Sequence, residues 1–199
     1  MLATWLLAIL IGAVLGLART AGAEEPQAYV AVQAGGHLWP DRSNHDDLEA
    51  DSDPGFSGGA AAGLIARRGD FSARLEIEAV HRVSAIHGRN SGGDHRSADG
   101  EDLHATALSL NLWPAWEFSP GWRLYAGGGG GGSWLQALDD DVIAPHWQAG
   151  GGVAYDLGER FSLDLGYRYY RVAERDLGGF GAGYDTHGPM IRAVVRFGP

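Results

Sequence analysis

The segment Phe161-Ser162-Leu163-Asp164-Leu165-Gly166-Tyr167-Arg168-Tyr169 decides the fold class of this chain. Its odd-numbered residues are apolar or aromatic, whereas its even-numbered residues are small or charged. Because successive side chains of a β-strand point to opposite faces, this alternation predicts a strand with one apolar and one polar face. No segment after residue 23 shows a convincing helical period, so we expect an all-β protein.

Seven further segments show the same two-residue period. The clearer ones are residues 71–79, 105–112 and 191–197, and the weaker ones are residues 28–34, 56–66, 122–130 and 147–157. Together with residues 161–169 they predict eight antiparallel strands. An even number of strands suits a closed transmembrane β-barrel.

The predicted connections alternate between short and long. Tight turns are expected at Arg68-Gly69-Asp70, Ser119-Pro120-Gly121 and Gly158-Glu159-Arg160, because these segments are rich in turn-forming residues. A membrane barrel typically has short periplasmic turns at one end and longer external loops at the other. The four long external loops are expected at Asp41–Pro54, His87–Asp102, Ala137–Pro145 and Asp176–His187.

The first 23 residues predict an export signal. Leu6–Ala18 is almost entirely apolar but too short to cross a bilayer comfortably as a helix, and Ala21-Gly22-Ala23 supplies the small residues of a cleavage site. We therefore expect a signal peptide over residues 1–23 and one barrel domain over residues 24–199. The alternative is an uncleaved membrane anchor, because no Arg or Lys precedes the apolar run.

The overall composition excludes several classes of function. The formal net charge of −10 argues against nucleic acid as a partner. The chain has no cysteine, so it contains neither disulfides nor a thiolate site. After residue 23, no apolar stretch approaches the roughly 20 residues that a membrane-spanning helix requires.

Alternation alone does not say which face looks outward, because a soluble ligand-binding barrel places its apolar side chains inside. Three features favour an outward apolar face. Charges of both signs lie in mid-strand and could pair across a narrow lumen, aromatic residues lie near predicted strand ends as in interfacial girdles, and glycines leave room inside. The charged residues are Arg74, Glu76, Glu78, Arg123, Asp156, Asp164, Arg168, Arg192 and Arg196, and the aromatic residues are Trp39, Trp113, Trp116, Trp122, Trp134, Trp147, Tyr169 and Tyr170.

The segments Leu163–Val172 and Ile191–Phe197 resemble the C-terminal hairpin of the small outer-membrane β-barrel superfamily, which includes the OmpA transmembrane domain, OmpX, Ail-type proteins and the opacity-type adhesins. The resemblance covers essentially the whole chain after residue 23. It implies a location in the cell outer membrane of a Gram-negative bacterium. The implied partners are outer-membrane lipid, lipopolysaccharide and the barrel-assembly machinery, which recognises a C-terminal aromatic residue; here Phe197 is followed by Gly198 and Pro199.

Candidate site residues are sparse. The nearest His and Ser pairs in sequence are His81 with Ser84 and His104 with Ser109, but neither matches the His-x-Ser pattern of lipid A deacylases. His45, His95 and His187 lie in or beside acidic segments and could form a metal site, although solvated loop residues are the simpler interpretation. We therefore assign no catalytic, cofactor-binding or metal-binding residue and expect no cofactor.

The sequence favours a non-enzymatic role that is structural, adhesive or based on contact with a host or another surface. The external loops would perform this role by binding a surface ligand that the sequence does not identify. The alternatives are a lipid A-modifying enzyme, a small pore and a soluble barrel with an apolar ligand inside. Eight strands leave an interior just wide enough for side chains, which argues against the pore.

Overall fold

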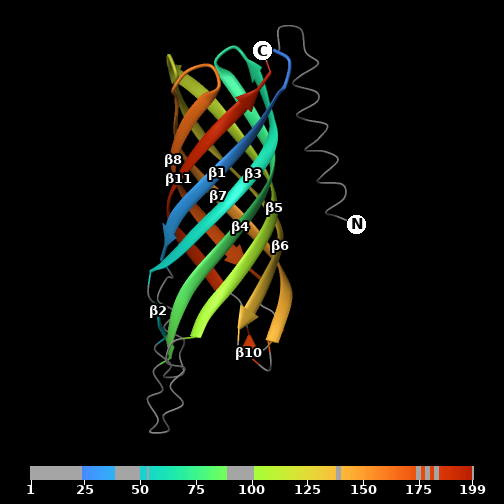
Figure 1. Cartoon of the computed structure of the whole chain (residues 1–199), viewed down its shortest axis with the longest axis vertical. Helices are drawn as coiled ribbons and strands as arrows, with labels where there is room; N and C mark the ends of the chain where they lie inside the picture. Colours follow the sequence, from blue (N-terminus) through green and yellow to red (C-terminus); the bar gives the residue numbers. More distant parts are fainter. Residues whose placement is uncertain are drawn as a thin grey trace.

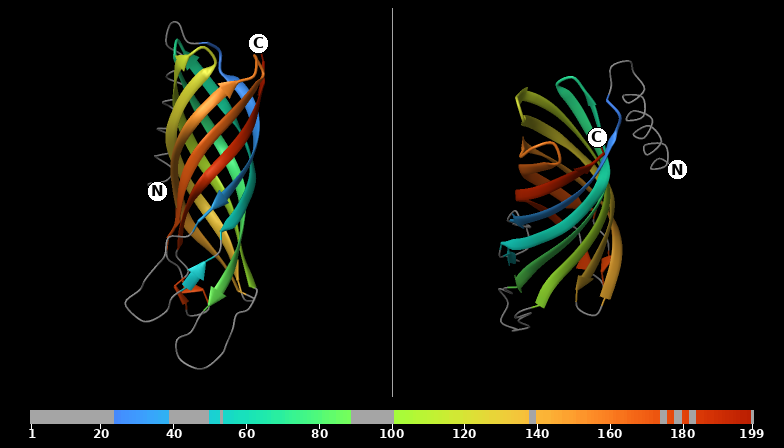
Figure 2. Two further views of the ribbon diagram at one scale, coloured as in Figure 1. Left: turned by 90° about the vertical axis from the view of Figure 1, so that its left-hand side faces the viewer. Right: turned by 45° about the horizontal axis from the view of Figure 1, so that its top comes forward.

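The computed structural model describes residues 24–38, 50–52, 54–88, 101–137, 140–173, 176–177, 180–181 and 184–198. Within this part of the chain, eight long antiparallel strands form a closed barrel, as the sequence predicts (Figure 1, Figure 2). The described residues include no helix that could cross a membrane.

Each long strand pairs with its sequence neighbours, and the ring closes where the first strand pairs with the last. Pairing on both sides of every strand satisfies the backbone hydrogen-bonding groups without an open edge. The short strand β2 (Ala50–Ser52) also pairs with β4, and β9 (Asp176–Leu177) and β10 (Phe180–Gly181) form a separate two-stranded sheet. The long strands are β1 (Gln27–His37), β3 (Gly55–Arg68), β4 (Phe71–Gly88), β5 (Glu101–Ser119), β6 (Trp122–Ala137), β7 (Asp140–Asp156), β8 (Phe161–Val172) and β11 (Tyr184–Phe197).

The three predicted tight turns are confirmed. They join β3 to β4, β5 to β6 and β7 to β8, and they lie together at the upper end of the barrel in Figure 1. Gly69 and Gly121 have φ angles of 56° and 78°, a conformation that suits glycine because it has no Cβ. We call this end the turn end and the opposite one the loop end.

The predicted loop Ala137–Pro145 is wrong. β6 and β7 stay paired as far as Ala137 and Asp140, so only residues 138–139 separate them. The predicted loops His87–Asp102 and Asp176–His187 are likewise shortened, because β4, β5 and β11 extend into them. The strand ends were predicted from where the apolar-polar alternation stops, but the backbone hydrogen bonds between the strands continue beyond that point.

The apolar face of the wall looks outward, as predicted. Ile77 is 58 % exposed, whereas its neighbour Glu78 on the same strand is fully buried in the lumen. A soluble barrel that holds an apolar ligand would show the opposite arrangement. An apolar surface that runs around the whole barrel is what a lipid environment requires.

Exposed aromatic side chains lie near both ends of the barrel. The prediction is wrong for Trp113 and Tyr170, which are only 1 % and 2 % exposed and point into the lumen. They lie an even number of residues from Asn111 and Arg168, so they share the polar face of their strands. Trp39 lies outside the described residues. The exposed aromatics are Phe71, Trp116, Phe118, Trp122, Tyr155, Phe161 and Phe197 near the turn end, and Phe56, Trp134, Trp147 and Tyr167 toward the loop end.

Glycines on the inner face of β6 let the wall coil tightly. A Cβ atom on Gly131 would lie only 1.8 Å from the carbonyl oxygen of Leu108 on β5, whereas on outward-facing Gly132 it would meet only Ile143 Cγ2 at 3.7 Å. Gly131 therefore has no room for any side chain, although its neighbour has.

This contrast makes a pair of matched variants. Gly131→Ala is expected to lower the free energy of unfolding by about 1–3 kcal/mol or more, because the methyl group displaces a paired strand. Gly132→Ala should change it by less than about 0.5 kcal/mol. Urea titration of the refolded protein in detergent measures both, and equal losses would contradict the close approach of β6 to β5.

Candidate functional site

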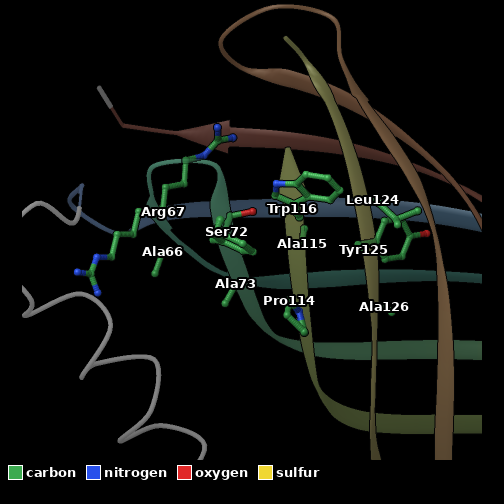
Figure 3. A pocket seen from close by; sticks show the side chains of 12 residues that line it. Ala66, Arg67, Ser72, Ala73, Pro114, Ala115, Trp116, Leu124, Tyr125 and Ala126 are labelled. Atoms are coloured by element: carbon green, nitrogen blue, oxygen red, sulfur yellow. The ribbon is translucent and has the colours of Figure 1, made fainter. Parts of the chain in front are cut away.

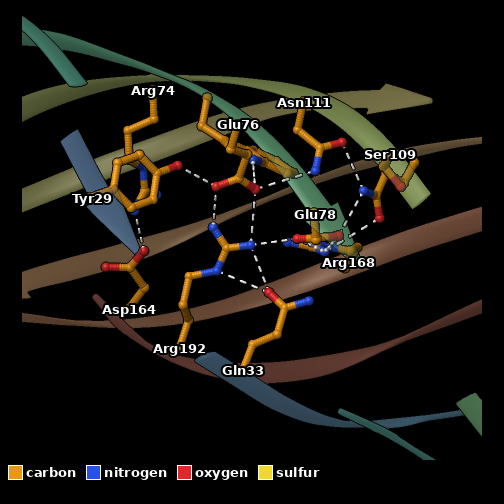
Figure 4. A network of polar contacts seen from close by, with 12 residues as sticks. Tyr29, Gln33, Arg74, Glu76, Glu78, Ser109, Asn111, Asp164, Arg168 and Arg192 are labelled. Atoms are coloured by element: carbon orange, nitrogen blue, oxygen red, sulfur yellow. Dashed lines mark hydrogen bonds and ion pairs between the residues drawn. The ribbon is translucent and has the colours of Figure 1, made fainter. Parts of the chain in front are cut away.

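The centre of the lumen is built around two carboxylates on β4, Glu76 and Glu78, which are almost completely buried. Arg192 on β11 binds both of them: its Nη1 lies 2.8 Å from Glu76 Oε2 and its Nη2 lies 2.5 Å from Glu78 Oε2. Arg168 on β8 binds Glu78 through Nη1 at 2.7 Å from Oε1. Figure 4 shows these contacts spanning the lumen between opposite walls.

Neutral side chains complete the coordination of these charges. Tyr29 and Trp113 donate hydrogen bonds to Glu76, the latter at 2.8 Å, and Gln148 donates one to Glu78 at 3.0 Å. Gln33 accepts a bond of 2.6 Å from Arg192. A buried ionic network whose members are hydrogen-bonded in this way holds its parts rigidly in place.

Two further ion-pair clusters confirm that the charges predicted for the polar face pair inside the barrel. Arg74 on β4 lies 2.5 Å from Asp164 on β8, directly across the ring. Near the turn end, Arg123 and Arg196 share Asp156, with 2.8 Å between Arg196 Nη1 and Asp156 Oδ1. The side chains of these clusters occupy the lumen.

A different set of polar side chains lies toward the loop end. His146 on β7 lies between two serines: its Nε2 is 2.8 Å from Ser109 Oγ and its Nδ1 is 2.8 Å from Ser133 Oγ. Ser133 also bonds the Tyr170 hydroxyl, and the guanidinium of Arg82 stacks 3.6 Å from the centre of the Tyr170 ring. This cluster was not predicted from the sequence, although the two-residue period of the strands places all of these residues on the inner face.

The structure does not bring His104 and Ser109 together. Ser109 points into the lumen and bonds His146, whereas His104 stacks on outward-facing His81, with 5.6 Å between the ring centroids. His81 Nδ1 lies 3.0 Å from Thr106 Oγ1 on the exposed outer surface. The side chain of Ser84 lies outside the described residues.

The histidines considered for a metal site are also separated or outside the described residues. His45 and His95 lie outside them, and His187 forms a hydrogen bond of 2.5 Å through Nδ1 with the Tyr167 hydroxyl. The described residues contain no group of three or more His, Asp or Glu side chains that could hold a metal ion.

The outer wall near the turn end carries an apolar depression of about 650 Å³ (Figure 3). Phe71, Trp116 and Leu124 are among its lining residues, together with the small residues Ala73 and Pro114. Most of the lining is apolar and belongs to the lipid-facing surface, although Arg67, Arg68 and Ser72 also contribute to it.

Comparison with known proteins agrees with this geometry. The family model of the outer membrane protein beta-barrel domain matches residues 6–197. The chain belongs to this family. It is therefore an outer-membrane β-barrel protein with its apolar face toward lipid and its charges in the lumen. No curated protein sequence matches the chain.

Solved structures with the same fold share little sequence with it. Neisserial surface protein A is 16% identical, with 87% of this chain and 100% of that chain covered and a TM-score of 0.54. Ail of Yersinia pestis, in complex with the heparin analogue sucrose octasulfate, is 12% identical over 89% of this chain and 100% of that chain, with a TM-score of 0.49. The N-terminal barrel domain of Pseudomonas aeruginosa OprF is 13% identical over 87% and 100%, with a TM-score of 0.47.

The lumen network predicts unequal effects for two arginines. Arg192→Met removes the cation shared by Glu76 and Glu78 and should lower the free energy of unfolding by about 3–5 kcal/mol, as when a buried pair loses one member. Arg123→Met should cost less, because Arg196 still binds Asp156. Urea titration of both variants measures the difference, and equal losses would contradict a central role for Arg192.

Proposed function

We propose that this protein is a non-enzymatic scaffold of the outer membrane whose external loops make structural, adhesive or host-surface contacts. The observation that supports the proposal most is the filled lumen. Buried ion pairs connect β4 with β8 and β11 across the ring, so the barrel is rigid and its interior is occupied by side chains. The connections at the loop end are then the part of the molecule best placed to meet a partner.

The composition of these connections suits solvent-exposed contact segments. Residues 38–54 join β1 to β3, residues 89–100 join β4 to β5, and residues 173–183 join β8 to β11. The first of them contains six acidic residues and a single arginine. A partner for this connection would present basic groups or bound cations, because like charges repel.

The lipid-facing wall suggests the remaining partners. Its aromatic girdles would contact outer-membrane lipid and, in the outer leaflet, lipopolysaccharide. The closing strand β11 ends on outward-facing Phe197, which would serve as the aromatic signal for the barrel-assembly machinery.

An enzymatic role is the second candidate, favoured by one observation. His81, Thr106 and His104 lie together on the outer surface toward the loop end, where a membrane lipid would have access to them. A lipid A-modifying enzyme needs a base beside a nucleophile at this face. Thr106 as a nucleophile would need activation by His81.

Loop replacement tests the proposal. Exchanging residues 40–49 or 90–99 for a short Gly-Asn-Gly linker should leave a folded barrel, because the long strands and their lumen contacts remain. Attachment of expressing cells to one another or to cultured epithelial cells should fall at least severalfold. Lengthening the turn at Gly69-Asp70 by three residues is the matched control, since it lies at the opposite end of the barrel.

Unchanged attachment in both loop variants would remove the adhesive role. Mass spectrometry of lipid A from the same cells tests the enzymatic candidate, and we expect no change of mass on expression. A change that His81→Ala abolishes would overturn the non-enzymatic proposal.

A further inference from the structure

Beyond the proposed function, and independently of it, we propose that the loop end of the lumen binds a monatomic anion such as chloride between Arg82 and Arg168. No carboxylate of the described residues forms an ion pair with Arg82. Its side chain nevertheless lies inside the barrel and is only 6 % exposed.

A small cavity lies beside this arginine. It has a volume of about 30 Å³ and is lined in part by Gln33, His37, Arg82, Arg168, Tyr170 and Thr186. A site needs roughly 10–15 Å³ to hold one water molecule, so the cavity has room for a monatomic anion but not for a phosphate, a sulfate or a sugar.

Two buried donors on arginines that line this cavity have no acceptor among the described residues. They are Nη1 of Arg82 and Nε of Arg168, whose side chain is about nine-tenths buried. Buried polar groups are almost always hydrogen-bonded, so donors of this kind indicate an occupant that the protein itself does not supply. Thr186 places a hydroxyl-bearing side chain in the same lining.

The distribution of charge selects an anion over water. In the centre of the lumen, Glu76 and Glu78 balance Arg192 and Arg168, and Asp164 balances Arg74. Arg82 is left over, and arginine stays protonated in proteins. Water would satisfy its hydrogen bonds but not its charge, whose burial without a counter-ion costs several kcal/mol.

Glu78 is near enough to act on Arg82 electrostatically, but it already forms ion pairs with Arg168 and Arg192, and the other groups around Arg82 carry no negative charge. Tyr170, which stacks against the guanidinium, offers only the partial charge of an aromatic face. His37 lies in the cavity lining, and the ring centroid of His146 is 4.9 Å from that of Tyr170. A histidine is either neutral or positive, so neither ring can act as a counter-ion.

Anion-dependent stability tests the site in the full-length protein. Thermal unfolding in detergent is compared in sodium chloride and in sodium gluconate at equal ionic strength. Chloride should give a saturable rise in melting temperature of about 2–4 °C, because a ligand that binds only the folded state stabilises it. Bromide should act like chloride, and bromide-soaked crystals should show an anomalous peak between Arg82 and Arg168.

Two variants assign the effect to this cavity. Arg82→Met keeps the apolar stem but should abolish both the chloride-dependent rise and the bromide peak. Arg67→Met is the control, because Arg67 also has no ion pair among the described residues but lies at the turn end and should keep the rise.

Equal melting temperatures of the wild-type protein in the two salts would overturn the proposal, as would crystals without a bromide peak in the cavity. A peak or a chloride effect that persists in Arg82→Met would also overturn it. Both wild-type measurements decide the question even if Arg82→Met does not fold.

Discussion

The ion pairs that Glu76 and Glu78 make across the lumen are the interaction on which the rest of the structure depends. Two carboxylates on one face of β4 must be kept from lipid, and each requires a cation from the facing wall. Arg168 and Arg192 reach them because β8 and β11 lie across a narrow ring from β4. Successive side chains of a strand point to opposite faces, so the strand that turns Glu76 and Glu78 inward also turns Ile77 outward. The apolar outer surface therefore follows from the polar interior.

Parity along the strands made much of this arrangement predictable from sequence. The alternation in residues 71–79 and 161–169 placed Glu76, Glu78, Asp164 and Arg168 on one face, and the structure confirms that they pair inside. The turns were predictable because Gly69 and Gly121 lie where the chain must reverse direction. The alternation alone did not distinguish a membrane barrel from a soluble ligand-binding barrel. The two differ in whether the apolar face points outward or inward, and the structure shows that it points outward.

The failures have equally specific causes. Trp113 and Tyr170 were assigned to the girdles by residue type, but parity puts them inside, where Trp113 donates to Glu76 and Tyr170 stacks with Arg82. The strand β7 begins at Asp140 because its backbone stays paired with β6 beyond the residues that alternate between apolar and polar. An alternation pattern does not show backbone pairing of this kind. The contacts of His146 with Ser109 and Ser133 join three different strands, and single-sequence patterns do not show which residues meet across strands.

Because side chains fill the interior and lipid covers the wall, the two ends of the barrel are the parts most accessible to a water-soluble partner. The turn end is closed by Arg123, Arg196 and Asp156, while the loop end combines polar connections with an unmatched arginine in the lumen. The molecule therefore has a rigid middle and a chemically distinct outer end. This division agrees with a scaffold whose specificity lies in its loops.

Because the chain contains no cysteine, a single introduced cysteine can report directly whether the apolar face of the barrel points outward. Ile77→Cys, labelled with bimane and refolded into lipid vesicles, places a fluorophore on the middle of β4. We expect strong quenching of the fluorescence when the vesicles contain lipids with a nitroxide on the acyl chain, compared with unlabelled lipids. Unchanged fluorescence in the folded protein would contradict it, because Ile77 would then not face the membrane.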